Sequence, residues 1–152
     1  MEAEFGFLCD ATTIDREGKI NALGIFDTLS GDKFPLKIFR MMLLISLVGK
    51  KSDGGDHDLE VKLLAPDGQD LIPAMQMKFG VPPEGGKARI VSELNNISFE
   101  KVGDYSFKVF VDKKAVTDIY LRVVQVPSPV SFIKEVPKKE APKKGSKKGK
   151  SS

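Results

Sequence analysis

The chain has 152 residues, of which 41% are hydrophobic and 30% charged, with a formal net charge of +3 at pH 7. This length predicts one domain that buries enough surface to fold without a disulfide or a metal, and the single cysteine excludes an internal disulfide. The longest apolar run, Met41–Val48, is far shorter than the ~20 residues of a membrane-spanning helix, and the acidic start Met1–Glu4 lacks a signal peptide's basic region. We therefore expect a cytoplasmic protein without a membrane span.

The N-terminal third predicts three extended segments separated by turns. Phe5–Cys9 is a short apolar strand, and Ile20–Leu29 follows it after a charged turn. Arg40–Val48 is almost continuously apolar, and it lies between a proline and a glycine. Its length and these flanking residues favour a strand covered on both faces over a buried helix.

The middle of the chain predicts a hairpin and a loop. Leu59–Leu63 alternates apolar and charged side chains, and Pro66–Gly68 supplies a turn because proline fixes φ and glycine accepts a positive φ. The partner strand is Gln69–Val81, and Pro73 near its start predicts an edge position or a bulge.

A further strand and a hairpin complete the pattern. Ala88–Phe99 is a strand whose apolar phase slips across Asn95 and Asn96, which predicts a bulge there. Asp104–Asp112 alternates clearly, and Ala115–Val126 resumes after a short polar loop, which is typical of a hairpin.

The pattern of seven or eight strands and no helix predicts an all-β fold, an antiparallel two-sheet β-sandwich of immunoglobulin-like type. Tyr105 opens a strand two residues after Gly103, which predicts either a tyrosine corner, with its hydroxyl bonded to the upstream backbone, or an ordinary core tyrosine. The side chains expected to face the core are Leu59, Val61, Leu63, Tyr105, Phe107, Val109 and Val111.

Charge divides the chain into two parts. Lys134–Ser152 holds eight of the 24 basic residues and two of the 21 acidic residues, so the tail is strongly basic and the preceding part mildly acidic. The tail has almost no apolar side chains and is expected to be disordered. We therefore divide the chain into a sandwich domain, residues 1–133, and a lysine-rich tail, residues 134–152.

The tail offers the only sequence indication of a partner. Its lysines could bind nucleic acid or another polyanion by counterion release. No aromatic residue or arginine lies among them, so such binding would be weak and independent of sequence; a merely solubilising tail is the alternative. The candidate residues are Lys138, Lys139, Lys143, Lys144, Lys147, Lys148 and Lys150.

Residues suited to catalysis are scarce. His57, the only histidine, lies in an acidic turn and could be a general base held by a neighbouring carboxylate or simply the opening of a strand. One cysteine and one histidine cannot supply a four-ligand zinc site, and the apolar neighbours of Cys9 predict a buried, inert thiol. Gly85–Lys87 lacks the spacing and the hydroxyl residue of a phosphate-binding loop.

Calcium is the only metal with candidate ligands. Asp53, Asp56 and Asp58 lie within six residues, and hard oxygen ligands clustered in a loop can bind Ca²⁺. The EF-hand order is not met, and aspartate and glycine also form turns without a metal. We therefore predict no catalytic residue, cofactor or metal site, with these three aspartates as the weak exception.

Several short segments occur in an order that points to a known family, and Lys19–Phe26 is the most specific of them. The segments are Phe7–Asp10, Gly18–Asp27, Phe34–Pro35, Gly55–Leu59, Pro66–Gly68 and Gly103–Asp112. The order resembles a bacterial family of small uncharacterised proteins, a domain of unknown function with a predicted β-sandwich. The resemblance covers roughly Phe5–Val126, leaves the tail outside, and implies the fold but no activity.

Four residues in the resembling segments are not needed by a generic sandwich: Cys9, Asp10, Asn21 and Gly24. If Asp10 and Asn21 are buried, they need polar partners, either each other, a ligand, or the backbone at a turn. The sequence as a whole predicts a non-enzymatic interaction or structural module with an unknown protein partner. The alternatives are an enzyme of unknown class and a weak nucleic-acid-associated protein acting through the tail.

Overall fold

The structure is a computed structural model that describes residues 1–128. In this part of the chain nine strands form two sheets, which confirms the all-β sandwich with one strand more than expected. The strands are β1 (Glu2–Ile14), β2 (Ile20–Phe26), β3 (Thr28–Gly31), β4 (Leu36–Gly49), β5 (Gly55–Leu64), β6 (Met75–Val81), β7 (Gly86–Phe99), β8 (Gly103–Val111) and β9 (Lys114–Gln125). A single turn of 3₁₀ helix, η1 (Lys51–Asp53), follows β4.

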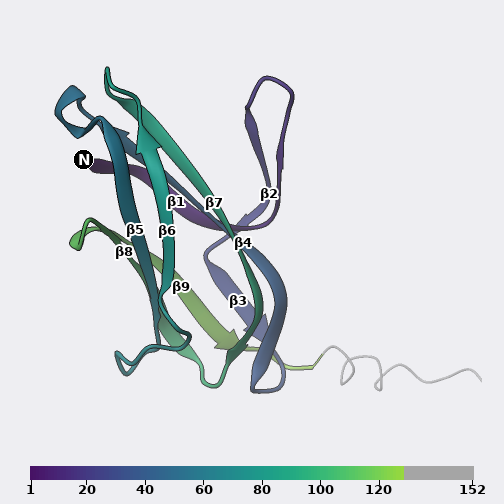
Figure 1. Cartoon of the computed structure of the whole chain (residues 1–152). Helices are drawn as coiled ribbons and strands as arrows, with labels where there is room; N and C mark the ends of the chain where they lie inside the picture. Colours follow the sequence, from purple (N-terminus) through teal and green to yellow (C-terminus); the bar gives the residue numbers. More distant parts are fainter. Residues whose placement is uncertain (129–152) are drawn as a thin grey trace, which may run out of the picture.

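The chain passes repeatedly between the two sheets (Figure 1). Sheet A has the order β2-β1-β4-β7, and sheet B has the order β3-β9-β8-β5-β6. All neighbours are antiparallel except β3 and β9, which run parallel. The immunoglobulin-like arrangement stays a prediction, and so does the domain boundary after residue 133, which lies outside the described residues.

The prediction of one strand over Ile20–Leu29 is wrong. The chain leaves sheet A after Phe26 and joins sheet B at Thr28. Asp27, between them, accepts a hydrogen bond through its carbonyl from the backbone N–H of Arg122, at 2.9 Å. The apolar pattern continues through this residue because both β2 and β3 have a buried side, although the two strands belong to different sheets.

Two strand details also differ from expectation. The partner of β5 begins at Met75 rather than Gln69, because Pro73 has no N–H with which to continue the ladder; β6 is an edge strand, as predicted. The predicted change of phase at Asn96 is present, with φ at +56°, but the register of β4 and β7 is unchanged. The prediction of a bulge, an extra residue in one strand only, is therefore wrong. β4 changes phase at Phe39, directly opposite Asn96, so neither strand gains a residue relative to the other.

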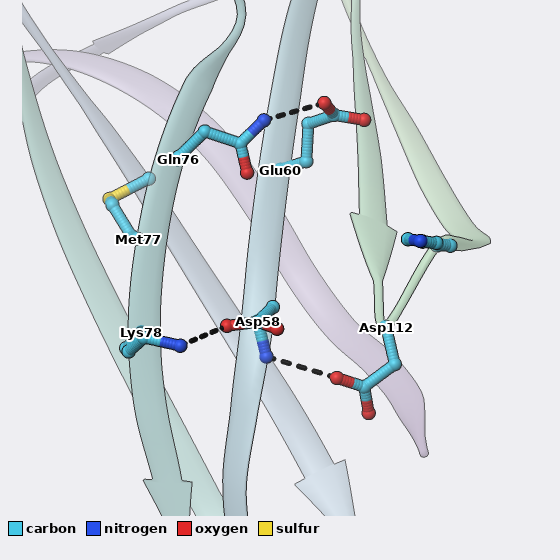
Figure 2. Close-up of a pocket in the computed structure, with 7 residues that line it drawn as sticks. Asp58, Glu60, Gln76, Met77, Lys78 and Asp112 are labelled. Carbon is cyan, nitrogen blue, oxygen red and sulfur yellow. Dashed lines mark hydrogen bonds and ion pairs between the residues drawn. The ribbon is translucent and has the colours of Figure 1, made fainter.

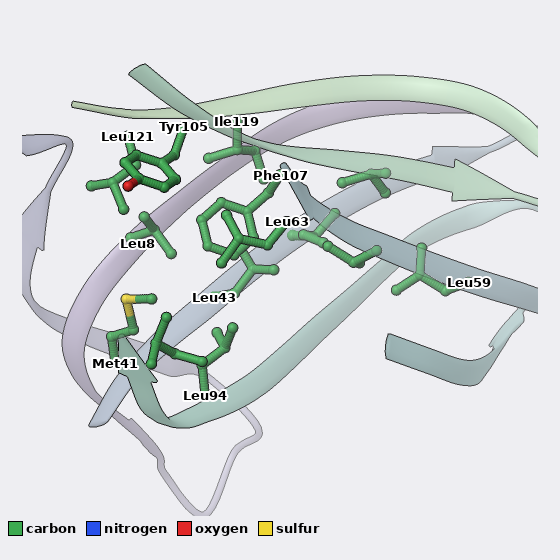
Figure 3. Close-up of a cluster of buried hydrophobic side chains, with 14 of the residues drawn as sticks. Leu8, Met41, Leu43, Leu59, Leu63, Leu94, Tyr105, Phe107, Ile119 and Leu121 are labelled. Carbon is green, nitrogen blue, oxygen red and sulfur yellow. The ribbon is translucent and has the colours of Figure 1, made fainter. Parts of the chain in front are cut away.

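The core lies between the sheets, and all seven predicted core residues are buried in it. Figure 3 shows Leu8, Met41 and Leu43 of sheet A facing Leu63 and Phe107 of sheet B. These contacts confirm the predicted strand phases of β5 and β8.

Tyr105 forms the predicted tyrosine corner. Its hydroxyl donates to the Lys101 carbonyl at 2.7 Å, and the Lys101 N–H donates to the same hydroxyl at 3.4 Å. The ring lies edge-on to Phe99, with 5.0 Å between the centroids. The residue therefore fills the core and also satisfies the backbone of the β7–β8 connection.

The central strand β4 is buried on both faces, as predicted. Met41–Leu47 are seven successive buried residues, and alternate members of this run belong to the core between the sheets. The other members face the opposite side of sheet A, where Leu44 lines a hollow together with Ile20 and Ala22 of β2. We call residues 10–26 the hairpin arm, because beyond Cys9 the β1–β2 hairpin no longer pairs with β4 and stands out from the sandwich (Figure 1).

We expect Phe107→Ala to lower the free energy of unfolding by roughly 3–5 kcal/mol, because it leaves a cavity in a closely packed core. Urea denaturation measures the loss, and the matched control is Phe39→Ala, whose side chain is 82% exposed. The control is expected to change stability by no more than about 0.5 kcal/mol. A loss below about 1 kcal/mol for Phe107→Ala would contradict the packing described above.

Candidate functional site

One hollow on the described surface lies over sheet B, where β5, β6 and the β8–β9 turn meet (Figure 2). It has a volume of about 650 Å³. It is lined by Asp58, Glu60, Gln76, Met77, Lys78, Asp112 and Lys113. The hollow therefore holds three carboxylates and two ammonium groups, while the Met77 side chain packs against the core.

Each carboxylate of this hollow already accepts a hydrogen bond. The Lys78 ammonium lies 2.6 Å from Asp58 Oδ1, and the Gln76 amide donates to Glu60 Oε2 at 2.6 Å. Asp112 holds the imidazole of His57. These pairs are typical of a cross-strand network. Each carboxylate of the hollow is therefore already bonded, and none is free to act as a catalytic acid or base.

His57 points away from this hollow, toward the end of the core. Its Nδ1 lies 2.6 Å from Asp112 Oδ2, and its Nε2 lies 2.6 Å from the Asp53 carbonyl oxygen. Both partners only accept hydrogen bonds, so both ring nitrogens must carry a proton, as in the imidazolium. The Asp112 hydrogen bond and then the Asp53 carbonyl raise the pKa of His57.

The His57 ring is also fixed sterically. It stacks on Phe79, with 5.5 Å between the ring centroids, and its side chain is 15% exposed. With both nitrogens donating to the protein, neither can take a proton from a substrate. A carboxylate does hold His57, as the general-base hypothesis required, but it belongs to Asp112, 55 residues away in the sequence. The hydrogen bonds fix β5 to the β8–β9 turn, and they leave no ring nitrogen free to act as a base.

Asp112 is the residue of this network that the sequence did not single out. Its carboxylate also accepts the Asp58 backbone N–H at 3.0 Å, while its own N–H donates to the Asp58 carbonyl at 2.9 Å. These bonds, first from the Asp58 backbone and then from His57, lower its pKa. Asp112 and Lys113 both have positive φ, 48° and 70°, and an aspartate in a two-residue hairpin turn was the only available signal.

The three candidate calcium ligands point in different directions. Asp53 accepts the Lys50 N–H at 2.8 Å and lies 3.4 Å from the Met1 ammonium, whereas Asp58 pairs with Lys78. Asp56 lies beside Gly80 in the β5–β6 ladder. Among residues 1–128 no group of three or more acidic, histidine or cysteine side chains is arranged to hold a metal ion.

Asp10 and Asn21 are both exposed, so the condition under which they would need buried polar partners is not met. Gly24 is required sterically, since its φ is +68° and a Cβ there would lie 2.3 Å from Asp10 Oδ2. Cys9 is buried as predicted, with its thiol 3.6 Å from the Ala11 carbonyl, and this burial raises the pKa of its thiol.

The candidate polyanion-binding lysines, from Lys138 to Lys150, lie outside the described residues. Gly85 ends the β6–β7 turn, which its N–H closes by donating to the Pro82 carbonyl, whereas Gly86 and Lys87 already belong to β7. The prediction that Gly85–Lys87 is a loop therefore holds for Gly85 only. Within residues 1–128 no helix has the length and apolar character needed to cross a bilayer.

A second candidate site is the exposed apolar surface of sheet A. Nine large apolar side chains of the described chain are exposed, and six belong to strands of sheet A, whereas only Tyr120 belongs to a strand of sheet B. The six are Phe5, Ile14, Leu23, Ile25, Phe39 and Val48. Exposed apolar residues concentrated on one side of a domain are typical of an interaction surface.

Comparison with known protein families identifies the family of this chain. It belongs to a family of unknown function (DUF6941), whose profile matches residues 4–124. The match spans almost the whole described sandwich, from β1 to the end of β9. Among curated proteins, no sequence matches the chain.

The His57 network predicts a pH-dependent stability. The folded-state pKa of His57 is raised above its ordinary value of 6.5, so its contribution is complete below about pH 6.5 and is lost as pH rises through the folded pKa. Conversely, the pKa of Asp112 is lowered from 3.8, so its contribution is lost only as pH falls through that lowered value. We expect His57→Gln to destabilise the protein more at about pH 5.5 than at about pH 8.5.

Urea denaturation of both proteins at the two pH values tests this, with Lys78→Gln as a control whose effect should not change across the range. His57 is the only histidine, so its NMR titration is unambiguous. A pKa at or below 6.5, or one that Asp112→Asn leaves unmoved, would contradict the clamp.

Proposed function

We propose that this member of DUF6941 is a non-enzymatic β-sandwich module of the bacterial cytoplasm that binds a protein partner on the apolar side of sheet A. The observation that carries the proposal is the uneven distribution of exposed apolar side chains between the two sheets. Phe39, at 82% exposure, is the most exposed of them. Aromatic side chains in such positions are typical anchors of protein interfaces.

The outer face of sheet B has a different character. Directly opposite residues of neighbouring strands form ion pairs there: Asp58 with Lys78, Lys108 with Asp118, and Asp104 with Arg122. Such pairs are solvated and contribute little to stability. Sheet A carries ion pairs as well, Arg40 with Glu93 and Lys87 with Glu4. The difference that supports a partner on sheet A is therefore its exposed apolar side chains, six against one in the strands of sheet B.

The non-enzymatic part of the proposal draws support from the sheet B hollow. General acid–base catalysis needs a group that can exchange a proton with a substrate, but the ring nitrogens of His57 are both engaged by the protein. Asp58 and Glu60 are each bonded to a side chain of β6. The arrangement is that of a fixed network.

Affinity capture from a bacterial lysate, read by mass spectrometry, tests the apolar surface. We expect a protein partner that is captured by the natural chain and by Tyr120→Asp, whose side chain is 66% exposed on sheet B. The same partner should bind Phe39→Asp at least tenfold more weakly, because a buried anchor is worth about 2 kcal/mol or more. Equal capture by Phe39→Asp and Tyr120→Asp, with both variants folded, would refute the proposed surface.

A second candidate function rests on the charge of the tail. Eight lysines and two glutamates occupy residues 134–152, and lysines so concentrated attract nucleic acid by releasing its counterions. We propose weak, sequence-independent polyanion binding as a property additional to the partner site, because the sandwich itself has a net negative formal charge.

Binding to duplex DNA is expected in the ~10⁻⁴–10⁻⁶ M range at physiological salt and to weaken steeply as salt rises. A chain that ends at Ile133 should lose this binding while its melting temperature stays unchanged. A salt titration of both proteins by fluorescence anisotropy measures the effect. Equal binding by the shortened chain would place the recognition site on the sandwich instead.

A further inference from the structure

We propose that the free edge of β2 pairs with β2 of a second copy of this chain, so that the two hairpin arms join in one antiparallel sheet. This inference rests on the proposed interaction function and names one partner for part of the same side of sheet A. Three observations support it: the edge of β2 has no charged residue or proline, β2 is exposed, and opposite charges flank its two ends.

The four sheet edges are protected unequally. An edge strand invites pairing with another chain unless it is short or carries charges, lysine especially. β3 has only four residues, β6 carries Lys78, and β7 carries Lys87, Arg89 and Glu93. β2 has seven residues, Ile-Asn-Ala-Leu-Gly-Ile-Phe, and none of them is charged or a proline.

The unprotected edge is also accessible. β2 pairs with β1 on one side only, and its residues make no backbone hydrogen bond to another described segment. Leu23 and Ile25 on it are 59% and 61% exposed. The end of the arm projects beyond the rest of sheet A in Figure 1. Ile20 and Ala22 of β2 line a hollow together with Leu44 of β4, so the outer edge of β2 is the side left open to a second arm.

One antiparallel register suits a second copy in particular. When Leu23 lies opposite its own counterpart, the two-fold axis places Lys19 opposite Asp27 of the second copy at both ends of the paired segment. Directly opposite side chains of opposite charge stabilise a strand pair, and like charges destabilise it. The same register sets Ala22 opposite Gly24, whose φ of +68° bends the strand at the position where the two smallest residues meet.

The end charges favour this occupant over an unrelated extended peptide. Lys19 and Asp27 flank an uncharged strand, so antiparallel pairing of two copies satisfies both residues twice. The Asp27 side chain accepts a hydrogen bond from its neighbour Thr28, at 3.0 Å, and lies near the Arg122 guanidinium. Lys19 pairs with the exposed Glu17. Lys19 and Asp27 are both exposed, so a partner strand can compete for them.

Sedimentation velocity of the full chain, from about 1 μM to about 1 mM, brackets the dissociation constants of weak complexes. We expect a monomer–dimer equilibrium in this range. Leu23→Lys should weaken dimerisation at least about tenfold, because two lysines would lie directly opposite each other. The control Tyr120→Lys, an exposed site on sheet B, should leave the equilibrium unchanged.

Charge reversal tests the register and does not depend on the apolar substitution. Lys19→Asp and Asp27→Lys should each weaken the dimer, since each places like charges opposite one another. The double variant K19D/D27K should restore it to within about threefold of the natural chain, because each opposite pair is regained. Equal melting temperatures show that the single variants remain folded.

A monomer at all concentrations, or a dimer that Leu23→Lys does not weaken, would overturn the inference. Failure of the double variant to recover would overturn the proposed register and the pairing of Lys19 with Asp27. These outcomes are distinguishable from failure of the proposed function. If the protein is monomeric but loses its captured partner on Phe39→Asp, the proposed partner surface stands and the β2 pairing fails. If it dimerises through β2 but captures no other protein, the β2 pairing stands and the proposed partner surface fails.

Discussion

The need to cover β4 on both faces organises this molecule. Its seven consecutive buried residues, Met41–Leu47, present apolar side chains to both sides of sheet A, and sheet B can cover only one of them. Phe5 and Phe7, whose rings stack with 5.6 Å between centroids, and the hairpin arm lie over the other. The apolar surface thereby protected is worth roughly 25 cal/mol per Å² removed from water, so the arm is part of the fold as well as a projection from it.

That arrangement explains why exposed apolar residues gather on sheet A. A hairpin that lies over a sheet has one side toward the sheet and the other toward solvent, and a narrow two-stranded arm cannot cover the whole face. Ile20 and Ala22 face the covered hollow, whereas Leu23 and Ile25 are left exposed. The proposed partner surface and the proposed β2 pairing both follow from this incomplete cover.

The opposite end of the sandwich is held by polar contacts that serve the fold. Asp112 bonds to the backbone of β5 and to His57, and His57 in turn reaches the carbonyl of Asp53 in η1. One imidazolium with two acceptors thus joins the β8–β9 turn to β5 and the adjacent η1, and His57 and Asp112 are 55 residues apart in the sequence. The only histidine of the chain therefore holds a turn in place. The carboxylates of the hollow beside it are likewise bonded.

The sequence by itself determined the fold class, most strands and the double burial of β4, because these depend on local alternation and on turn residues. For Tyr105 it left a tyrosine corner and an ordinary core position open, because the hydroxyl's partner depends on the path of the β7–β8 connection. It did not determine that Ile20–Leu29 divides between two sheets, since a buried side looks alike in either sheet. It could not pair His57 with Asp112 or separate Asp53 from Asp58, because strand pairing decides which distant residues meet. The unprotected edge of β2 likewise became recognisable only once the strand order was known: an edge is a property of the sheet, and no single strand carries it.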